Sequence, residues 1–332
     1  MAASGGTRAV IAALLANTGI AVTKFIAWLL TGASSMLAEA VHSVADAGNQ
    51  VLLLVGGRHA TREATASHPF GYGRVRYVYA FVVSIVLFSV GGLFALYEAF
   101  HKFEETREGH PNELLESRWW WVPLAVLTVA IVMEAFSLRT AVHESNKIRG
   151  TASWPEFVRR AKAPELPVIL LEDIGALVGL VLALIGVGMT LLTDNPYWDV
   201  AGTAGIGVLL VIIAITLAIE MSSLLVGEGA SEEQVVAITD AVVDADDIER
   251  VIHLRTLYTG PEELLVAAKI AVTRADTGER IAAAIDGAEE RIRAAVPEAT
   301  HIYLEPDIFR DRQPSTADPG PSTADVQPPA TD

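Results

Sequence analysis

The chain has 332 residues, of which 52% are hydrophobic and 19% are charged, and it contains no cysteine. Soluble domains carry about 25% charged residues, so this balance favours a membrane protein. The lack of cysteine excludes disulfide scaffolds, thiolate zinc sites and iron–sulfur clusters, and the net charge of −16 argues against a nucleic-acid partner, which would need a basic surface.

Six apolar segments are each long enough to cross about 30 Å of hydrocarbon as a helix. They predict a multi-pass protein of the lipid bilayer, with spans near 9–31, 35–57, 78–101, 119–142, 164–192 and 200–226. We therefore expect residues 1–227 to form a membrane domain of the all-α class, a six-helix bundle.

Lysine and arginine gather in the loops on one side of these spans. The loops 58–77 and 139–163 hold ten of them together, whereas 102–118 on the opposite side holds three. Because positively charged loops stay in the cytoplasm, both termini are predicted to be cytoplasmic, in a protein of the cell membrane.

The polarity changes after the sixth span. Residues 228–310 carry an excess of acidic residues and a soluble pattern with alternating helix and strand signals. The predicted elements are a helix from Ser231, strands 249–258 and 264–273, a helix 278–295 and a strand 300–305. This αββαβ order predicts a cytoplasmic, ferredoxin-like α+β domain. Residues 311–332 are rich in proline and are predicted to be a disordered tail.

The second span contains polar residues where lipid would be expected. His42 and Asp46 are four residues apart and share one helix face, and Glu39 and Asn49 extend that face at spacings of three. A carboxylate near the bilayer centre costs about 2.5–3.5 kcal/mol, so it needs a partner or a function. An imidazole nitrogen and a carboxylate oxygen one turn apart predict a site for one divalent ion.

The fifth span contains an acidic pair, Glu172 and Asp173, with apolar residues on both sides. Adjacent helical residues point about 100° apart, so we expect Asp173 to face the site directly and the longer Glu172 to bend toward it. Nitrogen and oxygen donors of this kind suit Zn²⁺ and also Fe²⁺, Co²⁺ and Mn²⁺. The alternative is a structural hydrogen-bonded lock between helices.

Other charged residues in the spans lack a matched partner in the sequence. Glu98, Glu134 and Glu220 are interpreted as structural or water-facing groups. Lys24 is expected to extend toward the interface or to pair with a carboxylate.

Three motifs carry a resemblance to a known family. They are His42-Ser-Val-Ala-Asp46, His68-Pro-Phe-Gly-Tyr-Gly73 and Gly227-Glu-Gly229. With six spans and a cytoplasmic α+β domain, the chain resembles the cation diffusion facilitator family over about residues 9–307. The variants HSxxDxxNQ and LLED are similar to its zinc-transporter branch. The resemblance implies a transporter that exports divalent metal ions, Zn²⁺ above others, in exchange for protons by alternating access. It also implies a homodimer that is not an enzyme and that needs no prosthetic group.

The resemblance also implies a ligand set of His42, Asp46 and Asp173. The position four residues before Asp173 is Ile169, which cannot bind metal, so Glu172 is our hypothesis for the fourth ligand. Asn49 and Glu39 are expected beside the ligands or at the entrance, and water or Asn49 is the alternative fourth donor. His42, with an ordinary pKa near 6.5, is expected to exchange metal for proton.

Further metal sites of some relatives are not expected here. In the loop before the third span, His68 matches one ligand, but Thr65 and Tyr72 stand at the other positions. In the cytoplasmic domain the matching positions hold Ile252, Ala268, Tyr303 and Glu305, with His253 nearby. We therefore expect that domain mainly to dimerise.

Two other classes of function stay open. An intramembrane metalloenzyme is disfavoured because the sequence has no H-E-x-x-H motif. A metal-sensing or scaffold membrane protein is the second alternative, and transport by the purified chain in liposomes would distinguish it from a transporter.

Overall fold

The structure, a computed structural model, describes residues 2–31, 34–109, 118–243 and 248–310. Within these ranges it does not describe the side chains of residues 2–6, 28, 30–31, 34–39 and 41–42. The predicted tail, 311–332, lies outside the described residues. The chain forms two compact units: one contains residues up to Ala230 together with Thr256–Leu265, and the other contains Ser231–Arg255 and the chain from Val266.

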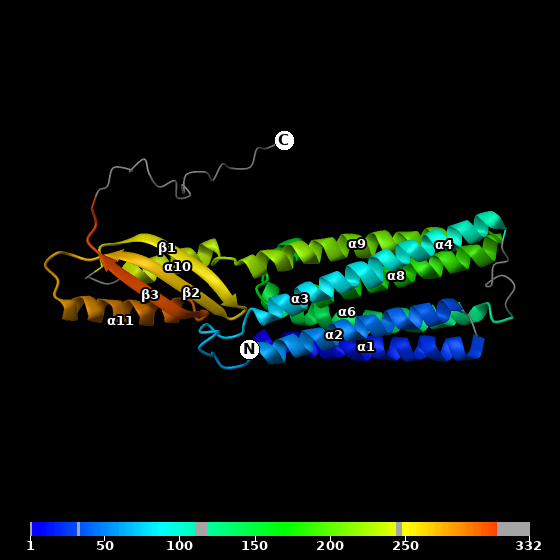
Figure 1. The fold of residues 1–332 in the computed structure, drawn as a ribbon, viewed down its shortest axis with the longest axis horizontal. Coiled ribbons are helices and arrows are strands. Elements are labelled where there is room, and N and C mark those ends of the chain that lie inside the picture. The colour runs from blue at the N-terminus through cyan, green and yellow to red at the C-terminus, as the bar shows by residue number, and fades with distance from the viewer. Residues whose placement is uncertain (1, 32–33, 110–117, 244–247, 311–332) are drawn as a thin grey trace, which may run out of the picture. The chain divides into compact units, whose positions relative to one another are not determined.

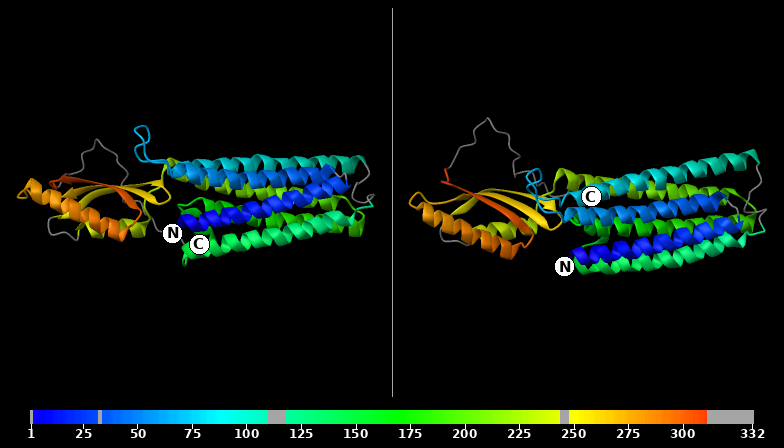
Figure 2. Two further views of the ribbon diagram at one scale, coloured as in Figure 1. Left: turned by 90° about the horizontal axis from the view of Figure 1, so that it is seen from below. Right: turned by 60° about the horizontal axis from the view of Figure 1, so that its bottom comes forward.

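Long helices make up the first unit and run side by side as a bundle (Figures 1 and 2). They are α1 (Ala2–Thr31), α2 (Ser34–Ala60), α3 (Val75–Val86), α4 (Phe94–Glu108), α6 (Trp121–Arg149), α8 (Glu165–Thr193) and α9 (Tyr197–Val226). The π-helical stretch η1 (Leu87–Leu93) connects α3 to α4 without a break, and the short helix α7 (Trp154–Arg160) precedes α8.

Five helical stretches of the described chain are long and apolar enough to cross a membrane. They are Thr7–Ala27, Val75–Glu108, Trp121–Arg149, Glu165–Thr193 and Tyr197–Val226. The sixth long helix of the bundle is α2, whose middle carries Asp46, Asn49 and Gln50. The predicted helical membrane bundle is confirmed.

Close contacts hold α9 against the continuous helical stretch made of α3, η1 and α4. A Cβ atom built on Gly207 would lie 2.7 Å from Leu96 Cγ, and one built on Gly92 would lie 2.7 Å from Val211 Cγ2. Because lipid tails are as apolar as leucine, helices in a membrane associate through such close van der Waals packing. These glycines therefore let α9 lie directly against η1 and α4.

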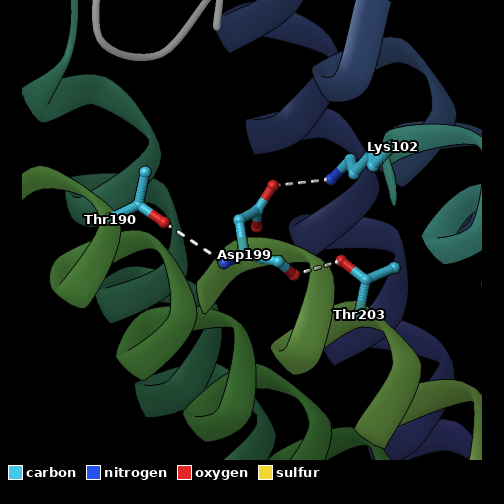
Figure 3. A network of polar contacts seen from close by, with 4 residues as sticks. All are labelled: Lys102, Thr190, Asp199 and Thr203. Atoms are coloured by element: carbon cyan, nitrogen blue, oxygen red, sulfur yellow. Dashed lines mark hydrogen bonds and ion pairs between the residues drawn. The ribbon is translucent and has the colours of Figure 1, made fainter. Parts of the chain in front are cut away.

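A polar network fixes the bundle end at which α4 ends and α9 begins (Figure 3). Lys102 Nζ on α4 donates to Asp199 Oδ2 on α9 at 3.0 Å. The Asp199 N–H donates to Thr190 Oγ1 on α8 at 3.2 Å, and Thr203 Oγ1 donates to the Asp199 carbonyl at 2.9 Å. One aspartate thus ties three helices together.

The second unit is a small α+β domain. Its elements are α10 (Glu232–Val243), β1 (Arg250–Gly260), β2 (Glu263–Ala271), α11 (Gly278–Ala295) and β3 (Ala299–Asp307), and the sheet order is β1-β2-β3. The two helices pack against each other on one face of the sheet (Figure 2), and Ile238, Ile270 and Ile292 are fully buried. The predicted αββαβ order is confirmed. The predicted boundary after residue 227 stays a prediction, because the tip of the β1–β2 hairpin groups with the helices.

Candidate functional site

A buried group of polar side chains lies in the interior of the helical bundle. We call it the polar cluster, and its members are Asn17 on α1, Asn49 and Gln50 on α2, Glu134 and Ser137 on α6, and Glu172 and Asp173 on α8. Each is 5% exposed or less. On α1, α2 and α6 they lie roughly 20 Å from the helix start at 1.5 Å per residue, well inside the hydrocarbon. Ionisable groups at this depth mark functional sites in membrane proteins.

Glu172 is held by two amides of α2. Its Oε1 accepts from Asn49 Nδ2 at 2.9 Å, and its Oε2 accepts from Gln50 Nε2 at 2.7 Å. Asn17 Nδ2 in turn donates to Gln50 Oε1 at 3.4 Å. These bonds join α1, α2 and α8. The two polar residues Asn49 and Gln50 of α2 thus both bind Glu172 of α8.

Asp173 points toward α6. It is 0% exposed, and its Oδ2 accepts from Ser137 Oγ at 2.8 Å. It also interacts electrostatically with the carboxyl group of Glu134 on α6, which is 1% exposed. The sequence analysis treated Glu134 as structural or water-facing and missed this neighbour. The available signal was the spacing of Glu134 and Ser137, which are three residues apart and so share one face of α6.

Asp46 completes the group of acids from α2. It is half-buried, and it acts electrostatically on Glu134, Glu172 and Asp173. The side chains of His42 and Glu39 lie outside the described part of the structure; the α2 backbone places residue 42 one helical turn before Asp46.

Lys24 brings a positive charge to this region. It is 4% exposed on α1, and its Nζ donates to Ser43 Oγ on α2 at 3.0 Å. Its ammonium group also acts electrostatically on the Glu134 carboxyl group of α6, which is one carboxylate that the expected pairing could involve.

The described residues do not contain three His, Asp or Glu side chains already arranged to hold a metal ion. The side chain of His42 is not among those residues, and the two oxygens of Glu172 are directed at amides. Asp46 acts electrostatically on the adjacent Glu172 and Asp173, but these three acids are not arranged as a metal site, and the ligand set as a whole stays a prediction.

The loop between α2 and α3 contains the other motif histidine. His68 Nδ1 hydrogen-bonds Ser67 Oγ at 3.1 Å, and its ring packs on Tyr72 with 4.5 Å between centroids. His68 and Tyr72 line a pocket of about 490 Å³, together with His59. These contacts order the loop, and the expectation that it lacks a metal function stays a prediction.

We expect Glu172→Leu to lower the free energy of unfolding by about 2 kcal/mol. The change removes the acceptor of two buried amide donors, and hydrogen bonds between membrane helices contribute about 0.6 to 1.7 kcal/mol each. Reversible unfolding in mixed detergent micelles measures the change. Glu98→Leu on α4, outside the polar cluster, is the control, and equal effects of the two variants would contradict a stabilising role for the Glu172 bonds.

Comparison with known proteins identifies the bundle. Residues 10–226 match the model of the cation efflux transmembrane domain. The mouse (Mus musculus) protein named "Proton-coupled zinc antiporter SLC30A9, mitochondrial" is 30% identical over 252 residues, which are 75% of this chain and 43% of the relative. "Metal tolerance protein C4" of Arabidopsis thaliana is 27% identical over 245 residues, 72% of this chain and 52% of the relative.

A bacterial relative is matched over most of its own length. "Magnetosome protein MamB" of Magnetospira sp. (strain QH-2) is 22% identical over 250 residues, 75% of this chain and 78% of the relative. By contrast, the chain spans less than half the length of the mouse relative. The match of the family model covers both the helical bundle and the whole polar cluster, and this chain therefore belongs to the cation efflux family of membrane transporters, the cation diffusion facilitators.

Proposed function

We propose that this chain exports divalent cations from the cytoplasm, Zn²⁺ above others, in exchange for protons by alternating access. Membership of the cation efflux family supports divalent-cation transport. The observation that carries the proposal is the buried pair Glu172 and Asp173 inside a membrane bundle, on which Asp46 of α2 acts electrostatically, since acidic groups there are costly unless they bind a cation or a proton.

In this proposal the cation binds His42, Asp46 and Asp173, with Glu172 as a fourth donor. Each Glu172 oxygen accepts one amide hydrogen bond and keeps a second acceptor position, so the amides orient the carboxylate without using it up. Asn49 acts beside the ligands by holding Glu172, and Glu39 is placed toward the entrance. The same donors accept Fe²⁺, Co²⁺ and Mn²⁺.

Proton exchange follows from the chemistry of these ligands. Imidazole and carboxylate must be deprotonated to hold a metal ion, so a proton arriving from outside competes with the bound cation. The mouse relative is named a proton-coupled zinc antiporter, which supports this coupling as a proposal for the present chain.

In this proposal the chain lies in the cell membrane with both termini in the cytoplasm, and two copies dimerise through residues 228–310. The positive charge of the loops 58–77 and 139–163 supports the orientation. Labelling of single introduced cysteines from each side of sealed vesicles tests the orientation, and a monomeric mass of the purified chain in detergent would contradict the homodimer.

Zinc uptake by everted vesicles with an imposed pH gradient tests the function. We expect uptake that requires the gradient and that falls to background in His42→Ala and Asp46→Ala. The control is Glu98→Gln, which changes a carboxylate outside the polar cluster and should leave flux unchanged. Zinc flux that is indifferent to both substitutions would remove the proposal.

A further inference from the structure

A pair of carboxyl groups on α6 and α8 has oxygens that the rest of the described chain does not use. Glu134 and Asp173 are 1% and 0% exposed, and Asp173 accepts a hydrogen bond from Ser137, which shares a face of α6 with Glu134. Glu134 Oε1 and Asp173 Oδ1 accept no hydrogen bond from any described residue. Buried polar atoms in folded proteins almost always have a partner, so these two oxygens indicate a ligand between α6 and α8.

The two acids of α8 differ in this respect. Both oxygens of Glu172 accept amide hydrogen bonds from α2. Asp173 uses only Oδ2, which accepts from Ser137 Oγ, and its Oδ1 stays open. The open oxygens of the polar cluster are therefore Asn49 Oδ1 on α2 and the carboxyl oxygens Glu134 Oε1 and Asp173 Oδ1, and only the last two carry charge when ionised.

The charges around the pair also favour a bound cation. Asp46 acts electrostatically on both Glu134 and Asp173, and Lys24 acts on Glu134 from α1. Glu172 interacts with all three of these acids, so with the groups ionised four carboxylates are balanced by one ammonium group. Like charges at short range in a low-dielectric interior repel strongly, and a divalent cation between the carboxylates removes that repulsion.

We propose that Glu134 is a metal ligand contributed by α6, and that its Oε1 binds the transported cation together with Asp173 Oδ1. This inference rests on the proposed function and adds a donor that it does not contain. With Glu134 the donors come from α2, α6 and α8, and their number exceeds the four of a tetrahedral zinc site. Octahedral oxygen-rich sites suit Mn²⁺, so Glu134 widens the substrate range from Zn²⁺ toward Mn²⁺.

Calorimetric titration of the purified full-length chain with Mn²⁺ and with Zn²⁺ tests this role. Loss of a group that only orients a ligand weakens metal binding 10–100-fold, so we expect Glu134→Gln to weaken Mn²⁺ binding by at least about 10-fold. Zn²⁺ binding should weaken less, because the imidazole of His42 and the carboxylates of Asp46, Asp173 and Glu172 supply the four donors of a tetrahedral site. Glu134→Asp keeps a carboxylate and should restore part of the Mn²⁺ affinity.

Cobalt absorption gives a readout that a purely structural role would not move. Visible Co²⁺ bands become more intense when the coordination number falls from six toward four, so Glu134→Gln should intensify them. Glu220→Gln on α9, outside the polar cluster, is the matched control and should keep the spectrum and both affinities of the original chain.

The outcomes separate this inference from the proposed function. If Asp46→Asn and Asp173→Asn abolish binding while Glu134→Gln keeps both affinities and the cobalt spectrum, Glu134 is no ligand and the transport proposal stands. If Asp46→Asn and Asp173→Asn also bind both metals normally, the proposed function itself fails. If Glu134→Gln does not fold, an unchanged Mn²⁺ affinity and cobalt spectrum in Glu134→Asp overturns the inference, because the shorter side chain moves its carboxylate by one methylene group.

Discussion

Asp173→Asn is expected to abolish metal transport, with at least a 100-fold loss of Zn²⁺ flux in proteoliposomes. The amide keeps the size of the side chain and keeps an oxygen that accepts from Ser137 Oγ, as Asp173 Oδ2 does at 2.8 Å. The substitution removes the negative charge and replaces one carboxylate oxygen by an NH₂ group, which donates hydrogen bonds and cannot bind a cation. Direct metal ligands contribute more than the 10–100-fold of groups that only orient them.

The Asp173→Asn experiment separates chemistry from folding. Because Asp173 is 0% exposed, the variant must first show the same unfolding transition as the original chain. Ser137→Ala is the companion variant: it removes the hydrogen bond to Asp173 but no charge, so we expect flux to fall by less than 10-fold. Full Zn²⁺ flux in a folded Asp173→Asn variant would show that Asp173 does not bind the transported ion.

The sequence was sufficient to predict the long helices of the bundle and the αββαβ elements, but not the short helix α7 or the π-helical stretch η1. Helical spans follow from long apolar runs, since a helix in lipid satisfies its own backbone hydrogen bonds. The strands predicted over 249–258 and 264–273 are present as β1 and β2. Such signals are local, and a single chain segment contains each of them.

The contacts of the site could not be predicted in the same way. Asn49 and Gln50 are each more than 120 residues from Glu172 in the chain, and only the packing of α2 on α8 brings their side chains to it. Glu134 was missed for the same reason: its neighbour Asp173 lies on another helix, and a single sequence does not record which faces of two helices meet. The adjacent Glu172 and Asp173 were both recognised as important, but their different partners depend on rotation of α8 within the bundle.

The second large effect is expected at the start of α8, where an ion pair joins it to α3. Arg76 Nη2 donates to Glu165 Oε2 at 2.7 Å, and Arg76 Nε donates to Oε1. The two side chains are 15% and 8% exposed. Removing one partner of a buried ion pair costs about 3–5 kcal/mol, because the other charge stays buried and uncompensated. Arg76→Leu and Glu165→Leu should each lower the free energy of unfolding by about this amount.

The double variant Arg76→Leu with Glu165→Leu is the decisive measurement. Two apolar side chains leave no unpaired charge, so we expect it to be more stable than either single variant in reversible unfolding from detergent micelles. Arg160→Leu is the control, since its pair with Glu156 is exposed and contributes below about 0.5 kcal/mol. A double variant less stable than both single variants would mean that Arg76 and Glu165 act separately. Because α8 begins at Glu165 and reaches Asp173 two turns later, we expect loss of the ion pair also to shift the Asp173 carboxylate, which is a ligand in the proposed function.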